Sequence, residues 1–191
     1  MAQPKGPDYD FGAPPQLVDA TVGGSPKKLV IAGQKSGVLW ALDRMTGDVV
    51  WTDTLGAGAV GGGFMAAASV DRNGIYAWSN NAFKYAAPDS HTMDIAAFDP
   101  GTGKVLWKKT QAQPVGSTTA GFVAGGFYFV PSLDGLIRAY NTKTGDLAWT
   151  SSPMGSISTS LAITHGMIYF GTGLPIQFGG DGAPPSSLNV S

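Results

Sequence analysis

In the segment GVLWALDRMTGDVVW at 37–51, large apolar residues at Val38, Trp40 and Leu42 alternate with Leu39 and Ala41 on the opposite face, and the run ends at the polar Asp43. Alternation with a period of two predicts a half-buried β-strand, and a second short apolar run follows and ends at Trp51. Between the two runs, Asp43 can accept hydrogen bonds from backbone amides two residues on, and Gly47 can adopt a positive φ. This segment therefore predicts a β-hairpin.

The same frame returns at residues 94–107 and 136–149. The matching positions are an alanine (Ala41, Ala97, Ala139), a turn-starting residue (Asp43, Asp99, Asn141), a Thr-Gly pair (46–47, 102–103, 144–145) and a closing tryptophan (Trp51, Trp107, Trp149). The tryptophans at 51, 107 and 149 are spaced 56 and 42 residues apart, which is the scale of propeller blades. The spacing from Trp51 to Trp107 is the longer of the two, and most of its extra residues fall at 80–93, which predicts an inserted loop.

Further strands are expected at residues 17–21, 29–33, 75–79 and 127–131, and at 161–164 and 167–170. The fold class that follows is all-β: a β-propeller of about four four-stranded blades that forms part of a ring. Residues 1–191 are expected to be one domain, because no low-complexity linker interrupts them.

Composition supports an all-β chain. All thirteen acidic residues are Asp, and the chain holds 28 Gly and 13 Pro, so turn formers dominate and almost no helix is expected. The net charge of −1 gives no electrostatic reason to expect nucleic acid as a partner. The absence of cysteine excludes disulfides and thiolate metal sites. The sequence contains no apolar stretch of 18 residues, so no membrane-spanning helix is predicted. The first residues lack the apolar region of a signal peptide.

Two glycine motifs and two histidines suggest chemistry only weakly. Residues 56–61 match the dinucleotide pattern GxGxxG, but a poor helix start follows, so glycines that allow close backbone approach are the favoured interpretation. Residues 101–104 resemble the end of a phosphate loop but coincide with a hairpin turn. His91 and His165 have no paired spacing, so surface loop positions are expected rather than a metal site or a triad.

The repeat A-x-D-x-x-T-G-x-x-x-W resembles the blade signature of quinoproteins, the propellers that bind pyrroloquinoline quinone (PQQ). More specifically, PDYDFGAPPQLV at 7–18 and VIAGQKSGVLWALDRMTGDVVW at 30–51 resemble the polyvinyl-alcohol-dehydrogenase-like branch of that family. The resemblance spans the C-terminal half of a family member. Non-catalytic propellers, such as the outer-membrane assembly lipoprotein, share the blade signature.

The resemblance implies roles for three residues. Asp10 is the catalytic base and contacts a Ca²⁺ ion, Lys35 contacts the reactive carbonyl of the quinone, and Asn81, or Asn80 as the alternative, approaches the cofactor. The segment that carries the Glu and Asn ligands of Ca²⁺ and the tryptophan under the quinone in relatives would precede Met1. Without the resemblance, Asp10 and Lys35 are ordinary turn residues.

The implied function is the C-terminal part of a PQQ-dependent dehydrogenase in the periplasm. It would oxidise a small-molecule or polymeric alcohol by hydride transfer to the quinone and pass electrons to a cytochrome c-type acceptor. The alternative is a non-catalytic propeller scaffold or binding module. An incomplete ring leaves packing faces open, so the chain is expected either to self-associate, as a dimer that completes a pseudo-ring, or to be part of a longer protein. Alone it is expected to be inactive and to have no firm hold on PQQ.

Overall fold

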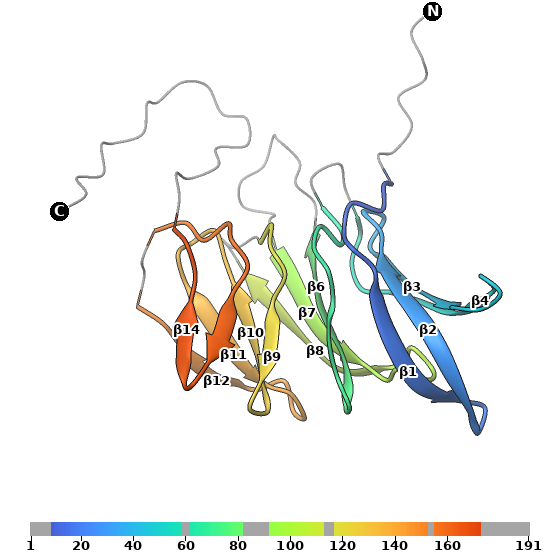
Figure 1. Ribbon diagram of the computed structural model, residues 1–191. Coiled ribbons are helices and arrows are strands. Elements are labelled where there is room, and N and C mark those ends of the chain that lie inside the picture. Colours follow the sequence, from blue (N-terminus) through green and yellow to red (C-terminus); the bar gives the residue numbers. More distant parts are fainter. Residues whose placement is uncertain (1–8, 59–61, 82–91, 113–116, 153–154, 173–191) are drawn as a thin grey trace, which may run out of the picture.

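The computed structural model describes residues 9–58, 62–81, 92–112, 117–152 and 155–172. None of these residues is helical, and so none of them forms a helix that could span a membrane. Their strands form three four-stranded antiparallel sheets and one two-stranded sheet, arranged side by side as an open fan (Figure 1). The predicted partial β-propeller is confirmed, with the fourth blade represented by two strands.

Each sheet is built from consecutive strands. Blade 1 contains β1 (Gln16–Val22), β2 (Ser25–Gly33), β3 (Val38–Asp43) and β4 (Val49–Thr54). Blade 2 contains β5 (Ser69–Asp71), β6 (Gly74–Asn81), β7 (Thr92–Phe98) and β8 (Val105–Ala112). Blade 3 contains β9 (Phe122–Ala124), β10 (Phe127–Pro131), β11 (Ile137–Asn141) and β12 (Leu147–Thr150), and a hairpin of β13 (Ala162–Thr164) and β14 (Met167–Tyr169) follows.

The three repeated segments form the hairpins that their turn residues predict. In the first, Met45 N–H donates to Asp43 Oδ1 at 2.9 Å, Gly47 N–H donates to Asp43 O at 2.8 Å, and Gly47 has a φ of 79°. The equivalent backbone bonds recur at Asp99 and Asn141. Each hairpin also contains a register shift directly after its repeated alanine, which the sequence pattern did not reveal.

The closing tryptophans of the first two hairpins dock on the turn of the next blade. Trp51 Nε1 donates to Pro100 O at 3.0 Å, and Trp107 Nε1 donates to Thr142 O at 2.8 Å. A Cβ at Gly103 would lie 2.5 Å from the Trp51 ring, and one at Gly145 would lie 2.6 Å from the Trp107 ring. The turn therefore needs glycine for two reasons, its positive φ and the indole that covers it.

Blade 2 is buried on both faces, because successive residues of β6 point to opposite sides of the sheet. Ile75 and Ala77 belong to the apolar cluster shared with blade 1, and Tyr76 and Trp78 belong to the cluster shared with blade 3. Blade 2 thus connects its two neighbours through apolar contacts.

The predicted inserted loop at 80–93 is shorter than expected. The ladder between β6 and β7 continues to the pair Asn81 and Thr92, so four of these residues belong to strands. The remaining residues, 82–91, lie outside the described residues, and so does His91.

Candidate functional site

The N-terminal approach segment is bonded to the turn between β2 and β3. Lys35 N–H donates to Asp10 O at 3.0 Å, and Gln34 Nε2 donates to Tyr9 O at 2.9 Å. These bonds bring together Asp10 and Lys35, which are far apart in the sequence. Lys35 Nζ lies 3.6 Å from Asp10 Oδ2, close enough for an ion pair but too far for a hydrogen bond.

The two charged side chains differ in exposure. The Lys35 side chain is 18% exposed, whereas that of Asp10 is 66% exposed. The ammonium is therefore held against the protein while the carboxylate faces outward, where a ligand can reach it. The structure brings these two predicted site residues together.

Glycines from the 56–63 run hold the Lys35 turn in place. A Cβ at Gly63 would overlap the Lys35 carbonyl, one at Gly58 would lie 2.4 Å from the Ser36 carbonyl, and Gly37 packs against the Gly56 carbonyl. This is the close backbone approach that the sequence favoured over a dinucleotide loop. Residues 59–61 lie outside the described residues, and none of the described residues after them is helical.

Asn81 stands at the end of β6 with its amide group engaged. Its Nδ2 donates to Asp94 Oδ2 at 2.7 Å and to Thr92 Oγ1 at 3.2 Å, and its Oδ1 accepts from Ala57 N–H at 3.2 Å. The opposite amide orientation would set Oδ1 against the Asp94 carboxylate, so this orientation is the favourable one. Asn81 can therefore offer a ligand only the remaining acceptor capacity of Oδ1.

Asn80 points into the protein instead. Its side chain is buried, its Nδ2 donates to Ser117 O at 2.8 Å, and its Oδ1 accepts from Ser117 N–H at 3.3 Å. These bonds tie blade 2 to the connection that enters blade 3. Asn80 is thus engaged inside the protein, and Asn81 is the more suitable of the two candidates for a ligand.

Asp94, on β7, is a buried carboxylate that sequence reasoning did not select. It accepts from Thr110 Oγ1 at 2.6 Å and forms an ion pair with Lys108 Nζ at 2.9 Å, in addition to its bond from Asn81. Lys108 Nζ also donates to Leu55 O at 3.0 Å, which joins this network to the connection between blades 1 and 2. One signal was available: Val38 and Leu136 occupy the matching repeat positions, so a carboxylate replaces an apolar residue only in blade 2.

The same contacts set the ionisation of Asp94. Burial by itself raises the pKa of this carboxyl, but hydrogen bonds from Thr110, Asn81 and Lys108 outweigh burial, and the pKa lies below its ordinary value. A carboxyl with a lowered folded-state pKa stabilises the fold above its unfolded-state pKa, and that contribution is lost as the pH falls through the folded-state pKa.

Asp94→Asn is accordingly expected to lower the free energy of unfolding at pH 7 by about 1–3 kcal/mol, because bonds to a charged acceptor are lost. The acid-induced fall in stability should become smaller in this variant. Urea unfolding at pH 7 and pH 3 measures both effects, with Asp19→Asn, an exposed carboxylate, as the control. Equal acid sensitivity in parent and Asp94→Asn would contradict the assignment.

The connection between blades 1 and 2 links the Lys35 turn to the Asn81 network. Gly37 packs against the Gly56 carbonyl, and Ala57, which follows Gly56, donates its N–H to Asn81 Oδ1. Within the described residues, no three His, Cys, Asp or Glu side chains form a group that could hold a metal. Asp10 could therefore supply one ligand to a cation, and the others would come from elsewhere.

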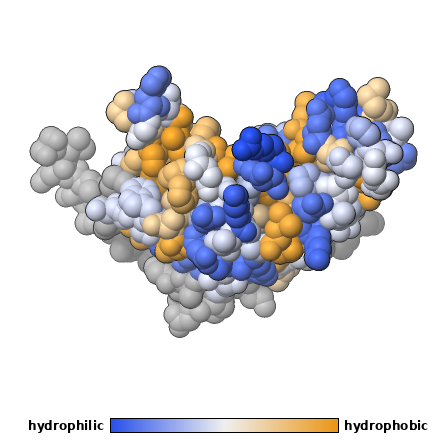
Figure 2. Space-filling view, turned by 90° about the horizontal axis from the view of Figure 1, so that it is seen from below, coloured by the Kyte–Doolittle hydropathy of each residue, from blue (hydrophilic) through white to orange (hydrophobic). Residues whose placement is uncertain are grey.

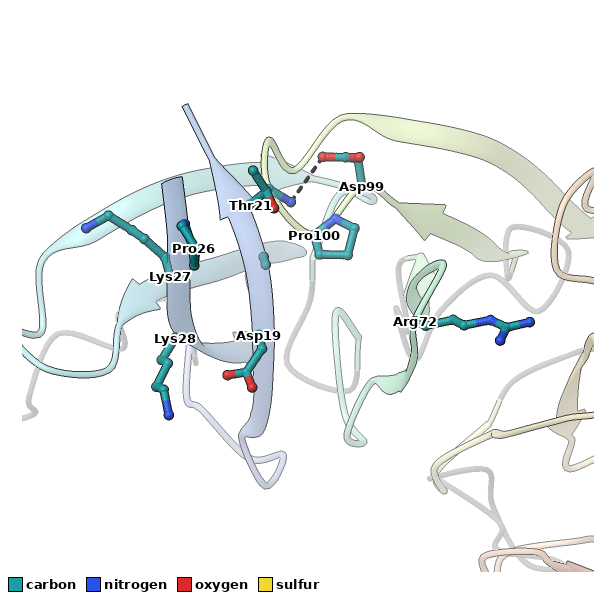
Figure 3. Close-up of a pocket in the computed structure, with 10 residues that line it drawn as sticks. Asp19, Thr21, Pro26, Lys27, Lys28, Arg72, Asp99 and Pro100 are labelled. Carbon is teal, nitrogen blue, oxygen red and sulfur yellow. Dashed lines mark hydrogen bonds between the residues drawn. The ribbon is translucent and has the colours of Figure 1, made fainter. Parts of the chain in front are cut away.

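A separate cavity of about 540 Å³ lies at the opposite end of β2, between blades 1 and 2 (Figure 3). Lys27, Lys28 and Arg72 contribute to its lining, but their charged ends point in different directions. Lys27 is already paired with Asp43 at 2.6 Å. These cations do not converge on a common ligand position.

His165 lies exposed in the turn between β13 and β14, where its φ is 49°. Its Nδ1 shares a hydrogen bond with Thr164 Oγ1 at 2.9 Å. The expected surface loop position is confirmed for this histidine.

Two family models match different parts of the chain. Residues 7–53 match the model described as glucose/ethanol/alcohol dehydrogenase, beta-propeller domain. Residues 91–182 match the model described as outer membrane protein assembly factor BamB. The segment that holds Asp10 and Lys35 therefore lies within the match to the dehydrogenase model.

Similar proteins include dehydrogenases of alcohols. The polyvinylalcohol dehydrogenase of Sphingopyxis sp. (strain 113P3) is 30% identical over 158 residues, which are 76% of this chain and 24% of the relative. Subunit 1 of the methanol dehydrogenase [cytochrome c] of Paracoccus denitrificans is 37% identical over 84 residues, 43% of this chain and 13% of the relative. The quinohemoprotein alcohol dehydrogenase ADHIIG of Pseudomonas putida HK5 has a similar fold, with a TM-score of 0.65, 15% identity, and coverage of 85% of this chain and 34% of that one. The chain spans about a quarter of the length of the polyvinylalcohol dehydrogenases that it matches.

Proposed function

Since the chain belongs to the PQQ-dependent alcohol dehydrogenase-like family of β-propellers, we propose that it supplies part of the cofactor site of a dehydrogenase that oxidises alcohols. The observation that carries the proposal is the ion pair of Asp10 and Lys35 at 3.6 Å. Backbone hydrogen bonds build this pair, and it lies within the segment that matches the dehydrogenase model.

The residues fit one side of a PQQ site. PQQ is an anionic quinone, so the ammonium of Lys35 suits it electrostatically. The glycine contacts hold the backbone of the Lys35 turn in place, and this fixes the point from which the Lys35 side chain extends. Asp10 Oδ2 and the remaining acceptor capacity of Asn81 Oδ1 are oxygen donors of the kind that Ca²⁺ prefers.

PQQ, when bound, would supply the quinone group that accepts a hydride, and with it two electrons, from the alcohol. The part of Asp10 is to accept the proton of the substrate hydroxyl, for which its exposed carboxylate is accessible. The Lys35 ammonium would stabilise the negative charge that develops on the carbonyl oxygen of the quinone. Asp94 keeps Asn81 oriented with its acceptor atom available.

The substrate, electron acceptor and compartment are proposed from the similarity to dehydrogenases. The substrate is a small-molecule or polymeric alcohol, and the electron acceptor is a cytochrome c-type protein, in line with the names of the similar dehydrogenases. The proposed compartment is the periplasm.

A second candidate function is a non-catalytic scaffold or binding module. The match of residues 91–182 to the assembly-factor model favours it. In that case the pair of Asp10 and Lys35 serves only to fasten the N-terminal approach segment to blade 1. Cofactor binding distinguishes the two functions.

Lys35→Ala is expected to weaken PQQ binding by roughly 10- to 100-fold, the usual loss for one charge-assisted contact. Titration with PQQ, followed by quenching of tryptophan fluorescence, measures this on the chain and on a complete propeller that contains it. Lys28→Ala removes the same charge from an exposed position at the other end of β2 and should leave the affinity unchanged. If Lys35→Ala binds PQQ as tightly as the parent in both settings, the scaffold function is favoured.

A further inference from the structure

Asp94 and Lys108 form a charge pair that only the second repeated hairpin contains. Asp94 is the one buried charged residue in the part of the chain that the structure describes, and its side chain is 6% exposed. Charged groups usually meet solvent, as do the hydrophilic residues visible on the underside of the fan (Figure 2). The other two hairpins have an apolar residue in place of Asp94 and a threonine, Thr52 or Thr150, in place of Lys108. A blade of this fold can therefore be built without this pair.

Lys108 closes a ring of contacts that passes through blades 1 and 2. Its Nζ lies 2.9 Å from Asp94 Oδ2, and the same oxygen accepts from Asn81 Nδ2 at 2.7 Å. The ring continues from Asn81 Oδ1 to the N–H of Ala57, at 3.2 Å, and along the backbone to Leu55. The Leu55 carbonyl accepts from Lys108 Nζ at 3.0 Å, which completes the ring. One ammonium thus joins the asparagine network to the backbone of the connection between the blades.

The backbone of residues 55–57 also holds the Lys35 turn. Leu55 N–H donates to Gly37 O at 2.9 Å. A Cβ at Gly37 would overlap the Gly56 carbonyl, so the turn and the connection are in close backbone contact. Residues 55–57 therefore contact both the turn in blade 1 and the asparagine at the end of β6.

Gly56 shows how closely this ring is packed. A Cβ at Gly56 would overlap Asn81 Oδ1 and would lie 2.8 Å from Ser79 Oγ. The three atoms nearest to that Cβ all belong to side chains, so alanine at this position would displace the Asn81 amide without a clash against backbone. The Ser79 hydroxyl is buried and has no hydrogen-bond partner among the described residues, so it does not help to hold the connection.

From these contacts we infer that Lys108 is a positioning residue, which keeps the Lys35 turn of blade 1 and Asn81 of blade 2 at a fixed spacing. The inference rests on the proposed function, in which both of those residues face the cofactor. Lys108 acts through the Leu55 carbonyl and the Asp94 carboxylate. Without the ammonium, the carbonyl loses its donor and the buried carboxylate loses its cation, so the two sides of the site can move independently.

Amide hydrogen exchange in the cofactor-free chain tests the ring directly. Lys108→Met removes the ammonium from a long side chain, and the amides of Leu55 and Ala57 should then exchange roughly 10-fold faster, the effect of one lost charge-assisted bond. Lys109→Met removes the same charge from the next residue, which pairs with Asp146 and is similarly exposed, at 40% against 43%, so it should leave both amides unchanged. Lys108→Arg can still bond both acceptors and should restore parental exchange.

Gly56→Ala is a second variant that keeps every charge and displaces the Asn81 amide. It should speed exchange at Ala57, which loses its acceptor. Circular dichroism checks that each variant keeps its β-structure, and if Lys108→Met loses that structure, Gly56→Ala decides the question. Parental exchange at Leu55 and Ala57 in a folded Lys108→Met chain, or an equal effect of Lys109→Met, would overturn the inference.

Titration with PQQ, in the chain and in a complete propeller that contains it, shows whether the ring serves the cofactor. Lys108→Met and Gly56→Ala should each weaken PQQ binding by roughly 10-fold, and the loss for Lys108→Met should persist at high salt, where a long-range charge effect is screened. In a Lys35→Ala background Lys108→Met should cost less, because the ring then positions only Asn81.

The two titration outcomes separate the inference from the proposed function. A parent that does not bind PQQ in either setting would refute the proposed function, while hydrogen exchange would still decide whether the ring exists. A parent that binds PQQ and a Lys108→Met variant that binds it equally tightly would overturn the positioning role.

Discussion

Asp10→Asn is expected to lower PQQ-dependent alcohol oxidation by roughly 10²–10⁴-fold in a complete propeller that contains this segment, the range for removal of a general base. The substitution keeps the size of the side chain and the backbone carbonyl that accepts from Lys35 N–H. It removes the carboxylate that would take the hydroxyl proton. Dye-linked turnover with saturating PQQ and Ca²⁺ measures the loss.

Binding must be separated from chemistry in this experiment. Asp10→Asn also leaves Lys35 without the opposite charge at 3.6 Å, so the affinity for an anionic cofactor should not fall. A variant that holds both PQQ and Ca²⁺ and has lost turnover identifies Asp10 as the base. Asp19→Asn, at an exposed position on β1, is the matched control and should keep parental turnover. Parental turnover in Asp10→Asn would make Asp10 a structural residue.

Trp107→Ala is expected to lower the free energy of unfolding by about 3–5 kcal/mol, the usual cost of removing a buried aromatic side chain. The indole fills the boundary between blades 2 and 3, covers Gly145, and donates to Thr142 O at 2.8 Å. Its removal leaves a cavity and an unpaired carbonyl at the same boundary. Urea unfolding, followed by far-ultraviolet circular dichroism, measures the change.

Two further variants separate packing from general strand effects. Leu106→Ala alters the neighbouring residue of β8, which is 52% exposed, and should change stability by no more than about 0.5 kcal/mol. Trp107→Phe keeps most of the aromatic contact but loses the hydrogen bond, so its cost should lie between the other two. A loss for Trp107→Ala no larger than that for Leu106→Ala would contradict the docking contact.

Local turn chemistry explains why the fold could be predicted from the sequence. The Asp or Asn that starts each hairpin accepts amides within the next few residues, and the glycine of each Thr-Gly pair has a positive φ, so these features depend on residues close in sequence. Repetition of the hairpin then indicated the propeller. The register shifts after the alanines were not predicted, because the apolar pattern of the two strands gives no sign of the extra residue.

The site was only partly accessible from the sequence. Asp10 and Lys35 were selected through family resemblance, and the backbone bonds between their segments could not be read from either segment alone. Asp94 was missed because its importance comes from partners on two other strands, Asn81 on β6 and both Lys108 and Thr110 on β8. The choice between Asn80 and Asn81 depended on which side chain points toward Ser117, and only the tertiary structure shows this.

Blade 2, buried on both faces, also determines where the molecule opens first. In a stack whose units contact only their neighbours, local unfolding begins at the ends and spreads inward. Among the described residues, the hairpin of β13 and β14, with strands of three residues, opens most easily. The Lys35 turn lies in blade 1, where Gly58 and Gly63 fasten it to the connection that leads into blade 2. Local unfolding of β13 and β14 can therefore occur while the Lys35 ammonium stays in position.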